Sequence, residues 1–254
     1  MATVAAIWRH PIKSHGREPL ASVTLSSGQV LPGDRRWAVS HDMSKDSADA
    51  GTWIACTNFM IGTRTPGLAG IWARLHDDDA TISLQHQDLG EITFCPDDAN
   101  DNARFIDWVL PLCPDTRARP VRLARIGTRG WTDTNFPSIS IMNTASHDAV
   151  SNKLDRAIER ERWRGNFWLD GLPAWEEENW IGRQLRIGSA VVEVREPIVR
   201  CLHTAANPVT GIRDADTLGT LERGWGHKNF GVYAEVIDGG VVATGDKVEV
   251  IECN

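Results

Sequence analysis

The sequence predicts a mainly β, α+β fold, with a barrel-like body and an N-terminal β-rich lobe that shares its core. Short runs of apolar and β-branched residues recur along the whole chain, separated by Gly, Pro and Asp turns, and helical periodicity is confined to two or three stretches. A chain of 254 residues also exceeds one ordinary domain. We therefore expect two closely packed units, at residues 1–118 and 119–254.

The first half is expected to consist mostly of strands. A strand over 3–9 leads into a loop at 11–16, where Pro, Ser and Gly favour a turn. The runs 23–25 and 37–39 are separated by a segment containing Gly and Pro, which predicts a hairpin-like arrangement. Further strands are expected at 69–75, 80–84, 91–94 and 121–126, and a short helix at 103–109.

The second half contains the clearest helix. A strand at 138–142 runs into a helix whose polar cap lies within 143–146. Val150, Leu154 and Ile158 then recur at i, i+4 and i+8 as one apolar stripe. The remaining strands are expected at 167–169, 184–187, 190–195, 232–237 and 247–251.

Composition excludes several classes of protein. The net charge of −7 disfavours binding to nucleic acid phosphates, although five arginines between 117 and 129 form either a solvated face or an anion-facing wall. No apolar run approaches the roughly 20 residues that span a bilayer, and residues 1–9 do not resemble a secretory signal. Five scattered cysteines, an odd number, argue against a disulfide framework. We expect a cytoplasmic protein with free thiols and no membrane span.

Cys201 is the first candidate functional residue. It follows Arg200 on a loop after an expected strand, and a neighbouring arginine favours the thiolate, which is both a nucleophile and a soft metal ligand. The alternative is a small buried apolar residue beside a surface charge.

Two further groups of residues could bind an anion. Arg162, Arg164 and Asn166 precede a strand, and Lys13 and Ser14 lie in a loop not far from Arg35 along the chain. The planar guanidinium group suits phosphate and carboxylate. Surface ion pairing remains the alternative for each group.

These residues fall in segments that resemble the MOSC-domain family. The chain matches the family's lysine–serine loop, its Asp-Arg strand, its strand-into-helix entry, its Arg-x-Asn segment and its cysteine. In order, the matching segments are 7–14, 31–39, 136–146, 163–177, 200–201, 207–211 and 245–248. The resemblance covers almost the whole chain and implies a MOSC β-barrel domain behind an N-terminal MOSC lobe.

The resemblance also implies roles for individual residues. Cys201 would ligate the metal of a molybdenum–molybdopterin cofactor, and Arg200 would lie beside the metal or the pterin as a second catalytic residue. The residues expected to hold the pterin and its phosphate are Lys13, Ser14, Arg35, Ser138, Arg164, Asn166, Arg200 and Tyr233. His203 stands where the family commonly has a small or aliphatic residue, and it is either a proton relay or a structural histidine. The family is also associated with pyridoxal phosphate binding.

The implied activity is that of the mitochondrial amidoxime reducing component and its bacterial relatives, the reduction of N-hydroxylated compounds by oxygen-atom transfer. The sequence has neither clustered cysteines for an iron–sulfur centre nor a dinucleotide-binding fingerprint. A separate electron donor of the ferredoxin, flavin or cytochrome type is therefore expected. Two alternatives stay open: a carrier of the cofactor, or of sulfur as a persulfide on Cys201, and a metal-free pocket for another anion.

Overall fold

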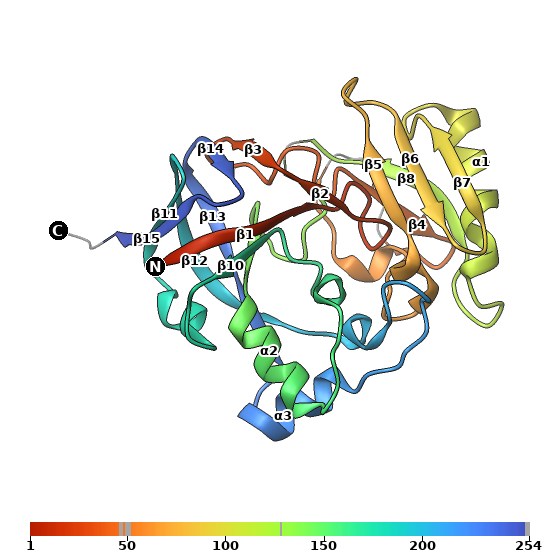
Figure 1. Cartoon of the computed structure of the whole chain (residues 1–254). Helices are drawn as coiled ribbons and strands as arrows, with labels where there is room; N and C mark the ends of the chain where they lie inside the picture. Colours follow the sequence, from red (N-terminus) through yellow and green to blue (C-terminus); the bar gives the residue numbers. More distant parts are fainter. Residues whose placement is uncertain (46–47, 49–51, 128, 252–254) are drawn as a thin grey trace.

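The body of the protein is a closed β-barrel. The structure, a computed structural model, describes residues 1–45, 48, 52–127 and 129–251. The barrel strands are β1 (Ala2–Arg9), β9 (Ile139–Asn143), β10 (Phe167–Asp170), β11 (Gln184–Ile187), β12 (Ala190–Val199), β13 (Asn229–Asp238) and β15 (Lys247–Ile251). They pair in the order β10-β9-β13-β12-β11-β15-β1, and β1 also pairs with β10, which closes the barrel (Figure 1). Only the β9–β10 pair is parallel.

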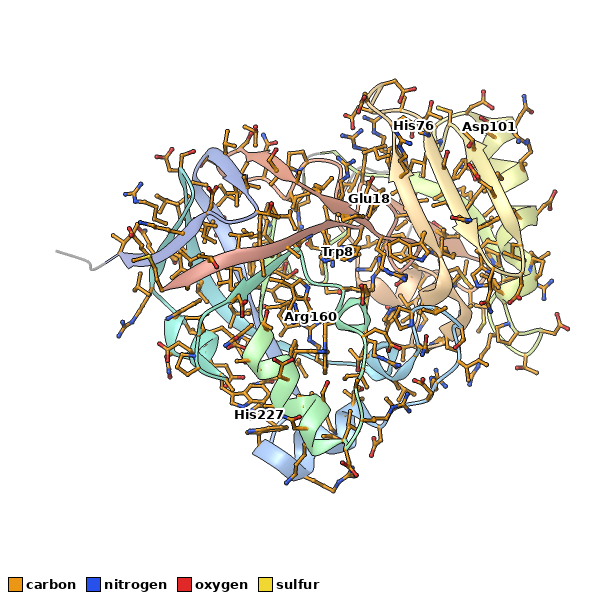
Figure 2. The ribbon with its side chains drawn as sticks, in the orientation of Figure 1. Trp8, Glu18, His76, Asp101, Arg160 and His227 are labelled. Carbon is orange, nitrogen blue, oxygen red and sulfur yellow. The ribbon has the colours of Figure 1, made fainter. Side chains whose placement is uncertain are left out.

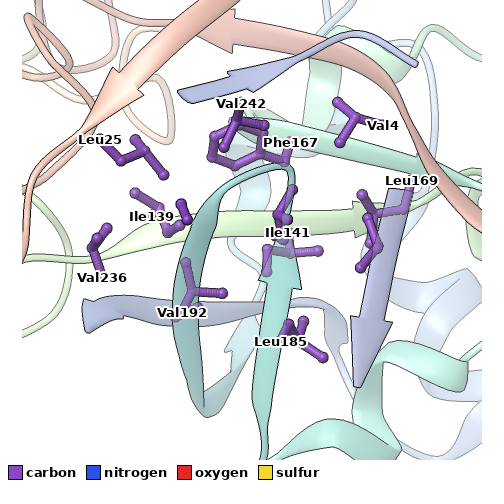
Figure 3. Close-up of a cluster of buried hydrophobic side chains, with 14 of the residues drawn as sticks. Val4, Leu25, Ile139, Ile141, Phe167, Leu169, Leu185, Val192, Val236 and Val242 are labelled. Carbon is purple, nitrogen blue, oxygen red and sulfur yellow. The ribbon is translucent and has the colours of Figure 1, made fainter. Parts of the chain in front are cut away.

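Alternation of side chains fills the barrel interior. Along β12, Ala190, Val192 and Val194 are buried while the residues between them are partly exposed. Figure 3 shows the apolar side chains that meet them, including those of Ile141 and Phe167. Each fully buried aliphatic or aromatic side chain contributes roughly 1.5–3 kcal/mol through removal of apolar surface from water. This shared interior holds β12 and β13 together.

A second group of elements forms the N-terminal lobe, drawn to the right in Figure 1. Its strands are β4 (Trp37–His41) and β8 (Pro120–Arg125), which pair with each other, and β5 (Trp72–Leu75), β6 (Ile82–His86) and β7 (Gly90–Phe94), which form an antiparallel sheet. Helix α1 (Ala99–Val109) begins at Asp98, whose side chain accepts from two backbone N–H groups. The lobe has its own core, in which the rings of Phe94 and Phe105 stack at 5.0 Å.

Two short elements connect the lobe and the barrel. Strand β2 (Glu18–Leu20) pairs with the outer end of β1, and Glu18 accepts a hydrogen bond from Arg9 at 2.7 Å. Figure 2 labels Glu18 together with Trp8, whose ring lies 6.1 Å from that of Trp72 in the three-stranded sheet. Strand β1 therefore contacts both parts of the molecule.

The helix expected after 138–142 is confirmed as α2 (Thr144–Lys153), and the side chain of Asn143 caps it by accepting from the N–H of Ala145. The expected apolar stripe is wrong at its last position. Asp155 has a φ of 53°, so the chain has left the helix before Ile158, which is buried from a following loop.

The hairpin expected between 23–25 and 37–39 is wrong. Strand β3 (Ser22–Leu25) pairs with β14 (Gly240–Ala243), and β4 pairs with β8. The physical reason is burial in two different cores: Leu25 packs inside the barrel, whereas Trp37 packs inside the lobe. Local turn residues do not reveal which core a strand joins. Elements β2, β14 and α3 (Thr217–Trp225) were not expected from the sequence.

The mainly β, α+β barrel fold is confirmed. The two halves exchange elements, because β1 from the first 118 residues closes the barrel and β8 from the remainder completes the lobe. A division at 118/119 therefore stays a proposal. Among the residues that the structure describes, no helix has the length and apolar character needed to cross a membrane.

Candidate functional site

A cavity of about 400 Å³ brings together residues from both halves of the chain. Strands β9, β12 and β13 contribute to its wall, as do loops from the first 63 residues. The volume lies within the roughly 300–1,000 Å³ of small-molecule sites. Seven of the nine predicted site residues line it, namely Lys13, Ser14, Arg35, Arg164, Arg200, Cys201 and Tyr233.

Cys201 lies at the mouth of the cavity. Strand β12 ends at Val199, and Cys201 precedes a 3₁₀ turn, Leu202–Ala205. The residue is exposed, and its Sγ accepts a hydrogen bond from Thr63 Oγ1 at 3.1 Å. A thiol in this position is accessible to a ligand inside the cavity and to solvent outside it.

Arg200 is held by the backbone around it. Its guanidinium donates to the carbonyl of Phe230 and, at 2.8 Å, to the carbonyl of Trp163, and it lies over both aromatic rings. Burial lowers the pKa of Arg200 to about 10, so the group stays charged at neutral pH. These contacts fix the entry to the Cys201 loop, with the positive charge beside the thiol.

Lys13 is paired with a residue that the sequence analysis missed. Its Nζ donates to Asp133 Oδ1 at 2.5 Å and to the carbonyl of Trp131 at 2.8 Å. The side chain of Asp133 is 52% exposed and lines the cavity. Partial loss of solvent around the carboxyl acts to raise its pKa, but the charges of Lys13 and then Arg35 outweigh this and lower it. Ser14 lies beside Lys13 with a φ of 63°, a left-handed conformation that turns the loop at the cavity wall.

Arg35 and Arg164 form the most electropositive part of the wall. Arg35 pairs with buried Asp34 and donates to the carbonyl of Arg164 at 3.2 Å. Arg164 donates to the carbonyl of Gly16 at 3.1 Å, but its Nη2 is buried and has no hydrogen-bond partner. Burial, followed by repulsion from Arg35 and Arg17, lowers the pKa of Arg164 to about 9. An unpartnered guanidinium nitrogen on a residue that lines the cavity indicates an anionic ligand.

Two aromatic or imidazole groups complete the wall. Tyr233 on β13 is half-buried, and burial raises its pKa above the ordinary value. Burial lowers the pKa of His203 to about 3, which keeps the ring neutral at physiological pH and favours the structural interpretation over a proton relay.

Asn166 and Ser138 do not line the cavity. The Asn166 side chain accepts from both the N–H and the hydroxyl of Ser140 and donates to the carbonyl of Trp8, so it joins β1, β9 and β10. Ser138 is buried and accepts a hydrogen bond from Thr134. In this structure the side chains of both residues make hydrogen bonds to other parts of the protein and do not line the cavity.

The cavity also contains residues that the sequence did not single out. Among the described residues these include Cys56, Thr63, Asp133 and Ser140. Arg162, which belonged to a candidate anion-binding group, also lines the cavity, and its guanidinium forms ion pairs with Glu159 and Asp214. The arginines at 117–129 are absent from the described lining residues. Cys253 lies outside the described residues.

The second half of the chain matches a known protein family. Residues 133–249, just under half of the chain, match the family model of the MOSC domain. The match includes β9 to β14 and the Cys201 loop.

Several known proteins are similar to this chain. Mouse mitochondrial amidoxime-reducing component 1 is 22% identical over 87% of this chain and 71% of that protein. A molybdenum cofactor sulfurase of Anopheles gambiae is 36% identical over 43% of this chain but only 12% of its own length. Among solved structures, the YuaD protein of Bacillus subtilis aligns over 100% of this chain and 98% of that chain, with a TM-score of 0.50 and 14% identity. The structural likeness concerns the fold alone.

Proposed function

We propose that the chain binds a molybdenum–molybdopterin cofactor in this cavity, with Cys201 as the metal ligand, and reduces N-hydroxylated compounds. The proposal is supported by one observation: the same cavity is lined by Cys201, whose thiol is accessible, and by Arg164, whose buried Nη2 has no hydrogen-bond partner. The name of the mosquito relative supports the molybdenum cofactor, and the name of the mouse relative supports the reduction of amidoximes.

The residues present fit such a group. A phosphate would complete the hydrogen bonding of Arg164 and offset its repulsion with Arg35. Lys13 and Ser14 add a second cation and a hydroxyl on the same wall. Thiolate sulfur is a soft ligand suited to a transition metal. An anion held by the arginines would therefore extend toward a metal at Cys201.

When bound, the cofactor would supply a two-electron centre that removes the oxygen atom from an N–OH group. The overall change consumes two electrons and two protons, converts N–OH to N–H and releases one water. The chain itself would bind the cofactor and orient the substrate against it. Arg35 and Arg164 bind the anionic part, and the apolar side chains of Trp163 and Ile198 limit water at the wall. The electrons would come from a separate donor protein of the ferredoxin, flavin or cytochrome type.

The first test is metal and pterin content after expression in a host that makes the cofactor. We expect near-stoichiometric molybdenum and pterin in the wild type, loss of metal in Cys201→Ala, and wild-type content in Cys95→Ala, whose cysteine is not among the described lining residues. Metal retained in Cys201→Ala would contradict its role as ligand. No metal or pterin in the wild type would leave another anion, such as pyridoxal phosphate, as the occupant of the arginine wall.

Turnover tests the catalytic half of the proposal. Loaded protein should reduce a benzamidoxime-type compound with an artificial electron donor. The alternative, a carrier of the cofactor or of sulfur, draws on the exposure of Cys201, which would let a persulfide meet a second protein. A loaded chain that transfers cofactor or sulfur but does not turn over would favour the carrier.

A further inference from the structure

The sulfur of Cys201 receives its one described hydrogen bond from the N-terminal part of the chain, not from the barrel strands around it. The donor is the hydroxyl of Thr63, 3.1 Å from Sγ, and the two residues are separated by 138 positions in the chain. Thr63 also lines the cavity.

Three hydrogen bonds to backbone carbonyls hold the turn that presents the Thr63 hydroxyl. The backbone N–H groups of Arg64 and Thr65 both donate to the carbonyl of Ile61, at 2.9 and 3.0 Å, and so close the turn that presents Thr63. The carbonyl of Thr63 accepts from Arg213 Nη2 at 2.6 Å. The first two contacts shape the turn, and the third ties it to the loop that follows Cys201.

The same turn is fitted to the neighbourhood of Cys201 through Gly62 and His203. A Cβ added at Gly62 would lie 1.6 Å from His203 Nδ1, so the backbone at Gly62 runs directly against the imidazole ring. His203 is buried, only two residues beyond Cys201. A glycine at 62 thus allows the approach that brings the next residue, Thr63, to the sulfur.

We propose that Thr63 is a positioning residue that donates a hydrogen bond to the metal-ligating sulfur and weakens its electron donation. The inference rests on the proposed function for its effect on the metal. A hydrogen bond to a thiolate withdraws negative charge from sulfur, and such bonds are known to tune metal–thiolate reduction potentials. The lobe would thereby set the potential of a metal bound to the barrel.

The first experiment needs no cofactor. Cys201 of the cofactor-free chain is alkylated with iodoacetamide at about pH 10, where most of an ordinary cysteine is thiolate, and the reaction is followed on the Cys201 peptide by mass spectrometry. A hydrogen bond worth about 0.5–1.5 kcal/mol corresponds to about two- to tenfold in rate. We expect Thr63→Val to react faster by about that factor, and Thr63→Ser to react at the wild-type rate.

Two further variants separate the hydroxyl from general disturbance. Thr24→Val removes an exposed hydroxyl on β3 and should leave the rate unchanged. Arg213→Met loosens the turn without touching the sulfur, and because the side chain of Arg213 is exposed, we expect the variant to fold. It should show part of the acceleration seen in Thr63→Val. Equal rates in Thr63→Val, Arg213→Met and the wild type would overturn the proposal.

The second experiment uses the loaded protein. The molybdenum reduction potential and the Mo(V) electron paramagnetic resonance spectrum are compared in wild type, Thr63→Val and Thr63→Ser. Loss of the hydrogen bond should lower the potential and change the spectrum, and serine should restore both. An unchanged potential and spectrum in Thr63→Val would refute the effect on the metal. A wild-type chain that holds no molybdenum would instead count against the proposed function, while the alkylation result still tests the hydrogen bond itself.

Discussion

Replacing Arg164 by methionine should stabilise the cofactor-free chain while abolishing cofactor binding. The guanidinium is kept in the cavity wall near Arg35 and Arg17, and its Nη2 makes no hydrogen bond. Methionine has a similar length and can fill the same space without the charge. The expected result is an increase in melting temperature, the reverse of what most substitutions of partly buried residues produce.

The size of the effect follows from the pKa. Lowering the pKa of Arg164 from its ordinary value to about 9 represents on the order of 5 kcal/mol against the charged form, at about 1.4 kcal/mol per pKa unit. Solvent in the open cavity screens part of this, and the hydrogen bond to the carbonyl of Gly16 is lost. We therefore expect a net gain of about 1–3 kcal/mol, or roughly 2–10 °C in melting temperature.

The pH dependence has a definite sign. Below pH 9 Arg164 is charged in both the folded and the unfolded chain, so the full penalty applies. Above about pH 9 the folded chain begins to lose the Arg164 proton while the unfolded chain keeps it, and the stability contribution of Arg164 rises with pH. The advantage of Arg164→Met should thus narrow above pH 9.

Thermal unfolding of the cofactor-free chain, followed by tryptophan fluorescence at several pH values, measures the expected gain in melting temperature and its decrease above pH 9. Arg183→Met is the matched control, because Arg183 is exposed and should change stability by no more than about 0.5 kcal/mol. A melting temperature for Arg164→Met at or below that of the wild type would refute the reasoning, since the guanidinium would then stabilise the cavity without a ligand.

Three other perturbations have clear expectations. Asn166→Ala should cost about 2–4 kcal/mol in urea unfolding, because it removes the acceptor of the N–H and hydroxyl protons of Ser140 and the side-chain donor to the carbonyl of Trp8; a loss below 1 kcal/mol would contradict that role. Gly62→Ala should lower the melting temperature and, by displacing the turn from His203, speed Cys201 alkylation as Thr63→Val does; normal behaviour in both assays would count against the fitted turn. Stability should fall steeply below pH 6.5, because burial lowers the pKa values of His10 and His203 to about 3 and those of His15 and His147 to about 4, so that the unfolded chain takes up protons first. Four such groups give up to about 5 kcal/mol per pH unit, and His147→Gln should reduce the slope by about one quarter; an unaltered slope would exclude His147 from the transition.

The sequence was sufficient for elements whose signals are local. Alternation of apolar residues identified the barrel strands at 184–187 and 190–195, and the polar residue at 143 capped the next helix as expected. Pairing was not predictable, because the partner of β3 is β14, more than 200 residues away, and the choice depends on which core takes Leu25. Ile158 was assigned to a helix because its spacing is helical, yet spacing does not detect the left-handed residue that ends the helix first.

The site divides in the same way. Residue types suited to an anion and a metal, such as Lys13, Arg164 and Cys201, were identifiable by their chemistry and do converge in the cavity. Asn166 has equally suitable chemistry, but its side-chain amide is hydrogen-bonded to residues of two strands, β1 and β9, which only the strand pairing reveals. Thr63 carries no signal at all in the sequence, since a threonine gains a role only through what lies 3.1 Å from its hydroxyl.

This contrast explains why the lobe belongs to the site. The barrel supplies the thiol and Tyr233, but Lys13 and Arg35 come from the N-terminal segment, as does the donor to the sulfur. An anion that supplies the missing hydrogen-bond partner of Arg164 must lie between groups contributed by both halves. Because the anion would bind the assembled cavity and not the separated halves, its binding would stabilise the contact between barrel and lobe. The same arginine that makes the cofactor-free protein less stable is, on this argument, the residue through which the ligand holds barrel and lobe together.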